Sequence, residues 1–101
     1  MSEETRKYPK DAEEVFEKLK KASREAGFNI DIIDETNKRL NLSTGLSLLS
    51  YGENVEVIVN REKGGGSKVF VSSKPKMFFN ITANTERNVK RVFEALDKEI
   101  H

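Results

Sequence analysis

The chain has 101 residues, a length typical of one domain with a single small hydrophobic core. Charged residues make up 35% of it but cancel to a formal net charge of +1, which argues against nonspecific nucleic-acid binding through phosphate neutralisation. The chain contains no cysteine, so a disulfide framework and a thiolate metal site are both excluded.

The N-terminal segment is polar, and we expect residues 1–8 to be a disordered tail ahead of a single domain at 9–101. This segment has no hydrophobic signal-peptide stretch. No apolar run in the chain approaches the ~20 residues that are needed to span a bilayer. We therefore expect a cytoplasmic protein.

Apolar residues at helical spacing predict a first helix over about 9–26. Pro9 suits the first turn of this helix, because its missing N–H costs no hydrogen bond there. Gly27 is expected to end the helix. The apolar positions are Ala12, Val15, Phe16, Leu19, Ala22 and Ala26.

Four segments of two-residue alternation follow, and each predicts a strand with one apolar side. Pro75 cannot donate to a strand ladder, so the fourth strand is expected to end near Lys74. The alternating residues are Phe28, Ile30 and Ile32; Leu40 and Leu42; Val55, Val57 and Val59; and Val69 and Val71.

A last helix is expected to begin between Thr82 and Thr85, which are both acceptable N-caps. Its apolar stripe consists of Val89, Val92, Phe93, Leu96 and Ile100. The resulting order, α-β-β-β-β-α, predicts an α+β fold of two layers. In this fold a four-stranded antiparallel meander sheet carries both helices on one face.

Alternate connections of an antiparallel meander fall at opposite ends of the sheet. The polar turns at 34–38 and 61–66 should therefore share one end, and the connections at 44–52 and 74–82 should share the other. Loops are usually polar, whereas this second pair of connections is rich in apolar residues. The residues concerned are Leu48, Leu49, Tyr51, Met77, Phe78 and Phe79, with Lys74 and Lys76 beside the aromatic side chains.

These residues have two interpretations. They close the core at the open end of the domain, or they form a binding surface, and the two interpretations overlap. Apolar anchors beside cations suit a membrane surface or an acidic amphipathic protein partner. The second interpretation predicts a noncatalytic binding or accessory module. The alternative function is a carrier that holds a small apolar ligand or lipid between helices and sheet.

The other face of the sheet is a second candidate surface. If the valines point at the helices, Ile33, Ile58 and Phe70 point away from them. A weak homodimer interface, or scattered apolar surface, explains these residues better than a nucleobase-stacking platform. The predicted strand order differs from that of the common RNA-recognition module. We expect no specific nucleic-acid partner.

The chemical motifs favour no enzyme, metal or cofactor. Asp31, Asp34 and Glu35 lack the ligand spacing of a calcium loop, so we interpret them as a solvated turn. The glycines at 64–66 join two strands, whereas a phosphate cradle leads from a strand into a helix. His101 is terminal, and no internal histidine exists to activate a serine.

The segments KVFVSSKP (68–75), NVKRVF (88–93) and LLSYGE (48–53) resemble a family of small bacterial α+β domains of unknown function. In that family a strand with a serine-rich end leads into the C-terminal helix. The resemblance implies a bacterial-type domain and no particular activity. The layout also resembles the helix-grip arrangement, whose larger members hold lipids. We expect this chain to be too short to enclose a comparable cavity.

Overall fold

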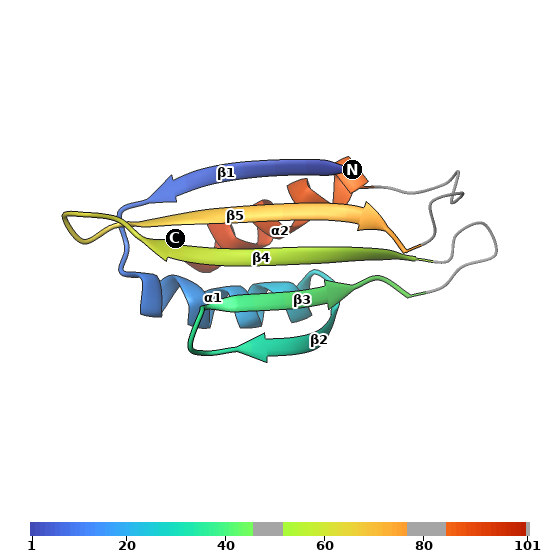
Figure 1. The fold of residues 1–101 in the computed structure, drawn as a ribbon, viewed down its shortest axis with the longest axis horizontal. Helices are drawn as coiled ribbons and strands as arrows, with labels where there is room; N and C mark the ends of the chain where they lie inside the picture. Colours follow the sequence, from blue (N-terminus) through green and yellow to red (C-terminus); the bar gives the residue numbers. More distant parts are fainter. Residues whose placement is uncertain (46–51, 77–84, 101) are drawn as a thin grey trace.

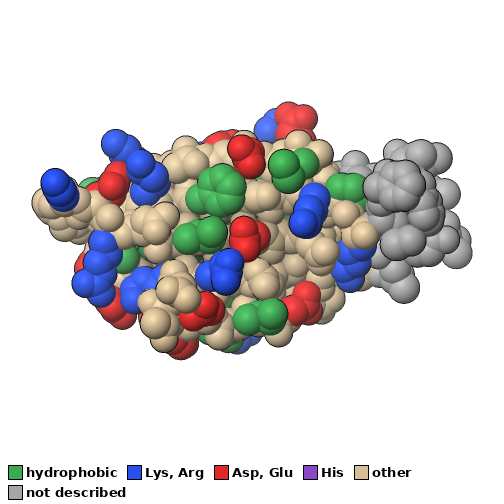
Figure 2. All heavy atoms as spheres, viewed as in Figure 1, with side chains coloured by type: hydrophobic (Ala, Val, Ile, Leu, Met, Phe, Trp, Pro, Cys, Tyr) green, Lys and Arg blue, Asp and Glu red, His purple; other side chains and the backbone are tan. Residues whose placement is uncertain are grey.

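The computed structural model describes residues 1–45, 52–76 and 85–100. It shows an α+β fold in which an antiparallel five-stranded sheet, ordered β1-β5-β4-β3-β2, carries two helices on one face (Figure 1). The opposite face of the sheet, termed the open face below, is turned to the viewer in Figure 2. The elements are β1 (Ser2–Tyr8), α1 (Ala12–Glu25), β2 (Asn29–Asp34), β3 (Arg39–Ser43), β4 (Glu53–Arg61), β5 (Ser67–Pro75) and α2 (Thr85–Ile100).

The predicted boundaries of α1 are close to those observed. Asp11 is the N-cap, and its side chain accepts a hydrogen bond of 3.2 Å from the backbone N–H of Glu13. The helix therefore begins after Pro9 rather than at it. Gly27 takes a φ of 91°, a left-handed conformation that glycine adopts without steric cost, and the chain turns there into β2.

The core lies between the two helices and the helix-facing side of the sheet. The inward residues of β3, β4 and β5 are buried under the apolar stripes of α1 and α2, as the alternation predicts. The largest fully buried side chains include Phe16, Leu19, Leu40, Leu42, Phe93 and Leu96. Packed side chains thus fill this layer between helices and sheet.

Residues 1–8 were expected to be a disordered tail, and this prediction is wrong. Residues Ser2–Tyr8 form β1, which pairs with β5 from Ser2↔Ser73 to Tyr8↔Ser67 and adds a fifth strand to the sheet. The Arg6 guanidinium lies 4.4 Å from the centre of the Phe93 ring. The Tyr8 hydroxyl donates a 2.8 Å hydrogen bond to Asp97. Long side-chain stems cover the edge of the core here, so β1 has no apolar alternation.

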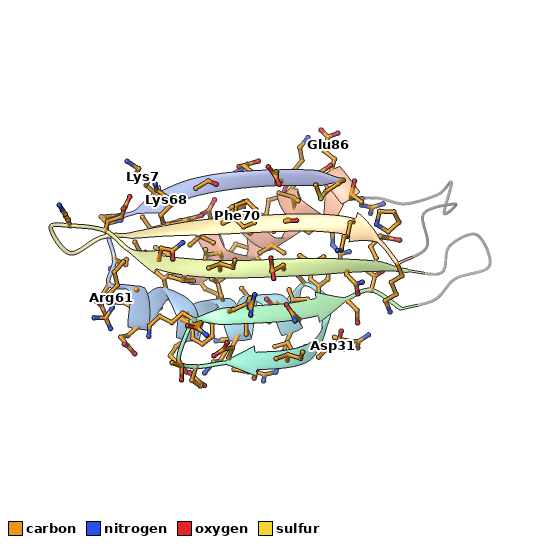
Figure 3. All side chains as sticks on the ribbon, in the orientation of Figure 1. Lys7, Asp31, Arg61, Lys68, Phe70 and Glu86 are labelled. Atoms are coloured by element: carbon orange, nitrogen blue, oxygen red, sulfur yellow. The ribbon has the colours of Figure 1, made fainter. Side chains whose placement is uncertain are left out.

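A bulge in β2 changes which isoleucine faces the helices. The pairing register shifts between Ile30 and Ile32, at Asp31 (labelled in Figure 3). Ile33 consequently pairs with the buried Leu40, and Ile32 pairs with Asn41. The prediction that Ile33 points away from the helices is therefore wrong. Ile32, which is 54% exposed, takes that place on the open face.

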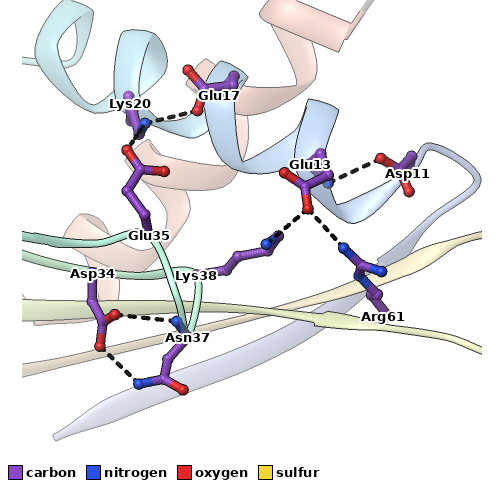
Figure 4. A network of polar contacts seen from close by, with 9 residues as sticks. All are labelled: Asp11, Glu13, Glu17, Lys20, Asp34, Glu35, Asn37, Lys38 and Arg61. Atoms are coloured by element: carbon purple, nitrogen blue, oxygen red, sulfur yellow. Dashed lines mark hydrogen bonds and ion pairs between the residues drawn. The ribbon is translucent and has the colours of Figure 1, made fainter.

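The polar turns at 34–38 and 61–66 share one end of the sheet, as predicted for a meander. One Glu13 carboxylate oxygen accepts from Lys38 at 3.0 Å and from Arg61 at 2.7 Å (Figure 4). The hydrogen bond and charge of Lys38, followed by those of Arg61, lower the pKa of Glu13 below its ordinary value. The first turn of α1 thus contacts both turns.

The Tyr8–Asp97 hydrogen bond leads to a test of the β1 assignment. Tyr8→Phe should lower the free energy of unfolding at pH 7 by about 1–2 kcal/mol, because a hydrogen bond to a carboxylate is lost. Urea denaturation measures this change. Lys7→Ala is the matched control, since Lys7 is exposed, and should change the stability by less than about 0.5 kcal/mol.

The difference in stability between wild type and Tyr8→Phe should also depend on pH. Burial, and then the Asp97 hydrogen bond, raise the pKa of Tyr8 above its ordinary value. Its contribution is therefore complete well below pH 10, near which unfolded tyrosine is half ionised, and is lost as the pH rises. The stability gap between wild type and Tyr8→Phe should narrow from pH 9 to 11, and a constant gap would contradict the assignment.

Candidate binding end of the sheet

The bases of the two apolar connections meet at one end of the sheet. Glu53, the first residue of β4, pairs with Pro75, the last residue of β5. The backbone N–H of Thr44 donates to the carbonyl of Glu53 at 3.0 Å, and the N–H of Lys76 donates to the carbonyl of Gly52 at 3.2 Å. The chain therefore leaves β3, enters β4 and leaves β5 in adjacent positions, which confirms that the connections share this end.

The structure describes two of the predicted binding residues. Lys74 lies near the end of β5, Lys76 follows that strand, and both are exposed. The exposed Lys74 and Lys76 thus lie at the meeting point of the connections. The other predicted binding residues are outside the described part of the chain: Leu48, Leu49, Tyr51, Met77, Phe78 and Phe79.

A buried polar cluster lies beneath this end. The Asn88 side-chain amide donates to a Glu53 carboxylate oxygen at 3.1 Å and to the Ser73 hydroxyl at 3.3 Å. Asn88 is only 2% exposed, Glu53 only 4%, and Ser73 is fully buried. The cluster holds β4, β5 and the first turn of α2 together. Sequence reasoning missed it, although Asn88 occupies a buried position four residues before Val92 on the apolar stripe of α2.

A shallow groove on the open face reaches this end. It has a volume of about 420 Å³ and is bordered by the exposed side chains of Met1 and Ile32, by the polar side chains of Asn41 and Ser72, and by Lys74. Because Lys74 belongs both to the groove and to the end of β5, the two surfaces are continuous.

The acidic turn residues are accounted for by local structure. Asp34 accepts from the backbone N–H of Asn37 at 3.1 Å and from the Asn37 amide at 3.0 Å (Figure 4). The side-chain hydrogen bond from Asn37, followed by the backbone one, lowers the pKa of Asp34. In the described ranges, no group of three histidine or acidic residues lies close enough to hold a metal ion. No helix within those ranges is long and apolar enough to cross a membrane.

No family model matches the chain, and no curated protein is similar to it. Among solved structures, the chain is similar to one titled "Crystal structure of Ara h 8.0201". The TM-score is 0.64 and the sequence identity is 15%, over 98% of this chain and 95% of the other. At this identity the likeness shows a common fold.

The buried cluster yields a stability prediction. Asn88→Ala removes a donor from the buried carboxylate of Glu53 and should lower the free energy of unfolding by about 2 kcal/mol. Arg87→Ala, at the exposed neighbouring position, is the control and should stay within about 0.5 kcal/mol of wild type. Equal losses in the two variants, measured by urea denaturation, would show that the cluster does not hold this end together.

Proposed function

We propose that the protein is a noncatalytic binding module, and that it docks through the end of the sheet from which the connections at 44–52 and 74–82 leave. An anionic membrane surface or an acidic amphipathic protein is the kind of partner that this end suits. The observation that carries the proposal is the hydrogen bond between Lys76 and Gly52, which joins the bases of the two connections. Two exposed lysines, Lys74 and Lys76, lie at the same point.

The distribution of residues along the chain supports this docking end. Tyr51 directly precedes Gly52, and Met77 directly follows Lys76. Since Gly52 and Lys76 are hydrogen-bonded, the apolar parts of both connections start from one place on the sheet. Apolar residues that adjoin cations contribute both burial of apolar surface and attraction to anionic headgroups or carboxylates.

The buried hydrogen bonds of the polar residues at this end support a noncatalytic role. The Asn88 amide donates to both Glu53 and Ser73, and all three residues are at most 4% exposed. They therefore hold strands and helix together rather than face a substrate. General acid–base or nucleophilic catalysis requires a group within hydrogen-bond reach of the reacting atom.

The alternative role, a carrier with its ligand between helices and sheet, has less support. Phe16 and Leu19 of α1 and Phe93 and Leu96 of α2 fill that layer in the described structure, and all are at most 2% exposed. A ligand there would have to displace packed side chains. At the docking end, the described Lys74 and Lys76 are already exposed.

Titration with lipid vesicles tests the proposal directly. On addition of vesicles with anionic headgroups, amide NMR signals of residues 44–45, 52, 74 and 76 should change first. Those of the hairpin at 62–66, at the opposite end, should change least. Vesicles of neutral lipid are the control for charge. Changes centred on the hairpin would contradict the docking end, and no change with any vesicle would exclude the membrane as partner.

The aromatic residues of the second connection provide the decisive variant. Phe78→Ser with Phe79→Ser should abolish vesicle binding and leave the circular dichroism spectrum and the unfolding transition close to those of wild type. If the double variant unfolds instead, these residues belong to the core and the binding interpretation fails.

The lysines provide a graded test in a protein that is expected to fold. Lys74→Gln with Lys76→Gln should weaken binding to anionic vesicles by about 30-fold, because each lysine near such a surface contributes about 1 kcal/mol. Lys7→Gln with Lys63→Gln is the matched control, as it removes the same charge from exposed positions at the hairpin end. Equal weakening by both pairs would indicate attraction without a specific docking end.

A further inference from the structure

One row of side chains crosses all the strands on the open face. The cross-strand register aligns Thr5 with Phe70, Phe70 with Ile58, Ile58 with Arg39, and Arg39 with Asp34. Paired residues of neighbouring strands share one face. The valines that flank Phe70 and Ile58 along β5 and β4 are buried under the helices, so the row points the other way. Figure 3 shows Phe70 on this side of the sheet.

The open face combines apolar residues with charges that nearly cancel. Phe70 and Ile58 are half-buried near its middle, and the more exposed Ile32 lies on the same face. Figure 2 shows hydrophobic side chains among both signs of charge there. Such a face favours neither a polyanion nor a polycation. The charged side chains are Lys7, Arg39, Lys68 and Lys74 against Glu3, Asp31, Asp34, Glu56 and Glu62.

Residues of both signs are spread over this face, and Glu3 lies on the same edge strand as Lys7. The lysines lie on β1 and β5, where Lys7 and Lys68 are each 3.8 Å from Glu62 of the hairpin. Asp31 and Asp34 belong to β2, at the opposite edge. Because the charges nearly cancel, a second copy of this face meets little net repulsion, and the row of paired residues then decides how two copies fit.

We propose that the open face binds the open face of a second copy of this chain, about a two-fold axis that runs along β4 at Ile58. This axis places β5 of one copy over β3 of the other, and β1 over β2, since β4 is the central strand. Ile58 then meets the partner's Ile58. Phe70 lies over the partner's Arg39, and Thr5 lies over the partner's Asp34.

Each of these contacts joins suitable chemical groups. Two isoleucines exclude water at the axis, a guanidinium stacks on an aromatic ring, and a hydroxyl donates to a carboxylate. Glu56 also lies near the axis, where it approaches its own symmetry mate. Its charge is offset by Arg39, whose guanidinium is 3.3 Å away in the same chain. The row of one copy therefore fits the row of the second copy, in which the strands run in the opposite order.

Sedimentation velocity of the full chain, from about 10 μM to about 1 mM, tests the association. Wild type should shift from monomer to dimer over this range. Ile58→Lys puts two cations at the axis, and Ile58→Glu puts two carboxylates there, so each variant should stay monomeric. An equimolar mixture of the two variants should form a heterodimer, because opposite charges then meet.

Ile33→Lys is the matched control. Ile33 is 40% exposed but pairs with Leu40 on the helix-facing side, so this variant should dimerise like wild type. The proposal is overturned if wild type stays monomeric throughout, if Ile58→Lys dimerises like wild type, or if the mixed variants remain monomeric.

A second measurement leaves Ile58 unaltered, in case the Ile58 variants fail to fold. Since the chain has no cysteine, Asn60→Cys accepts one spin label, and Asn60 alternates with Ile58 on the open face of β4. In a mixture with isotope-labelled wild type, amide signals of β3, β4 and β5 should broaden through the partner's label. Broadening confined to the helices would overturn the proposal. Among the described residues this interface shares Lys74 with the docking end, but dimerisation and vesicle binding are measured separately, so the two proposals fail independently.

Discussion

The in-register pairing of β4 with β5 is the constraint on which the rest of the structure depends. It runs from Glu53↔Pro75 to Arg61↔Ser67, and it fixes which side chains of both strands face the helices. One slipped residue would turn the buried valines outward and bring the polar residues into the core. The same pairing places the ends of both apolar connections together. Core, docking end and open-face row therefore depend on a single register.

The two ends of the sheet are held by different kinds of interaction. At the hairpin end, exposed ion pairs around Glu13 connect α1 to the turns, and such pairs contribute little to stability. At the connection end, the amide of Asn88 bonds to Glu53 and Ser73 in a buried site, where loss of a partner costs more. The end that we propose for docking is thus the one whose base is fixed by buried hydrogen bonds.

Hydrophobic periodicity predicted the helices, the inner strands and the shared end of the connections, because burial imposes a repeat that the sequence displays. It failed where burial is achieved without apolar residues or where the repeat is interrupted. In β1 the side chains of Arg6 and Tyr8 cover the edge of the core, so the sequence shows no alternation of apolar and polar residues. In β2 the bulge at Asp31 adds one residue, so Ile32 and Ile33 exchange faces. In the candidate site, the sequence predicted Lys74 and Lys76. It did not predict the hydrogen bonds of Asn88, because these join segments that are distant in the sequence.

The position of β1 has a consequence for edge-to-edge association of the sheet. Without it, β5 would present an unpaired backbone and the apolar run Val69–Val71 at the edge of the sheet, which is a template for further strands. β1 replaces that edge by a strand that carries Glu3, Arg6 and Lys7, whose charges oppose stacking. Removal of this polar N-terminal strand by a protease would therefore leave the edge of β5 open to pairing with strands of other molecules.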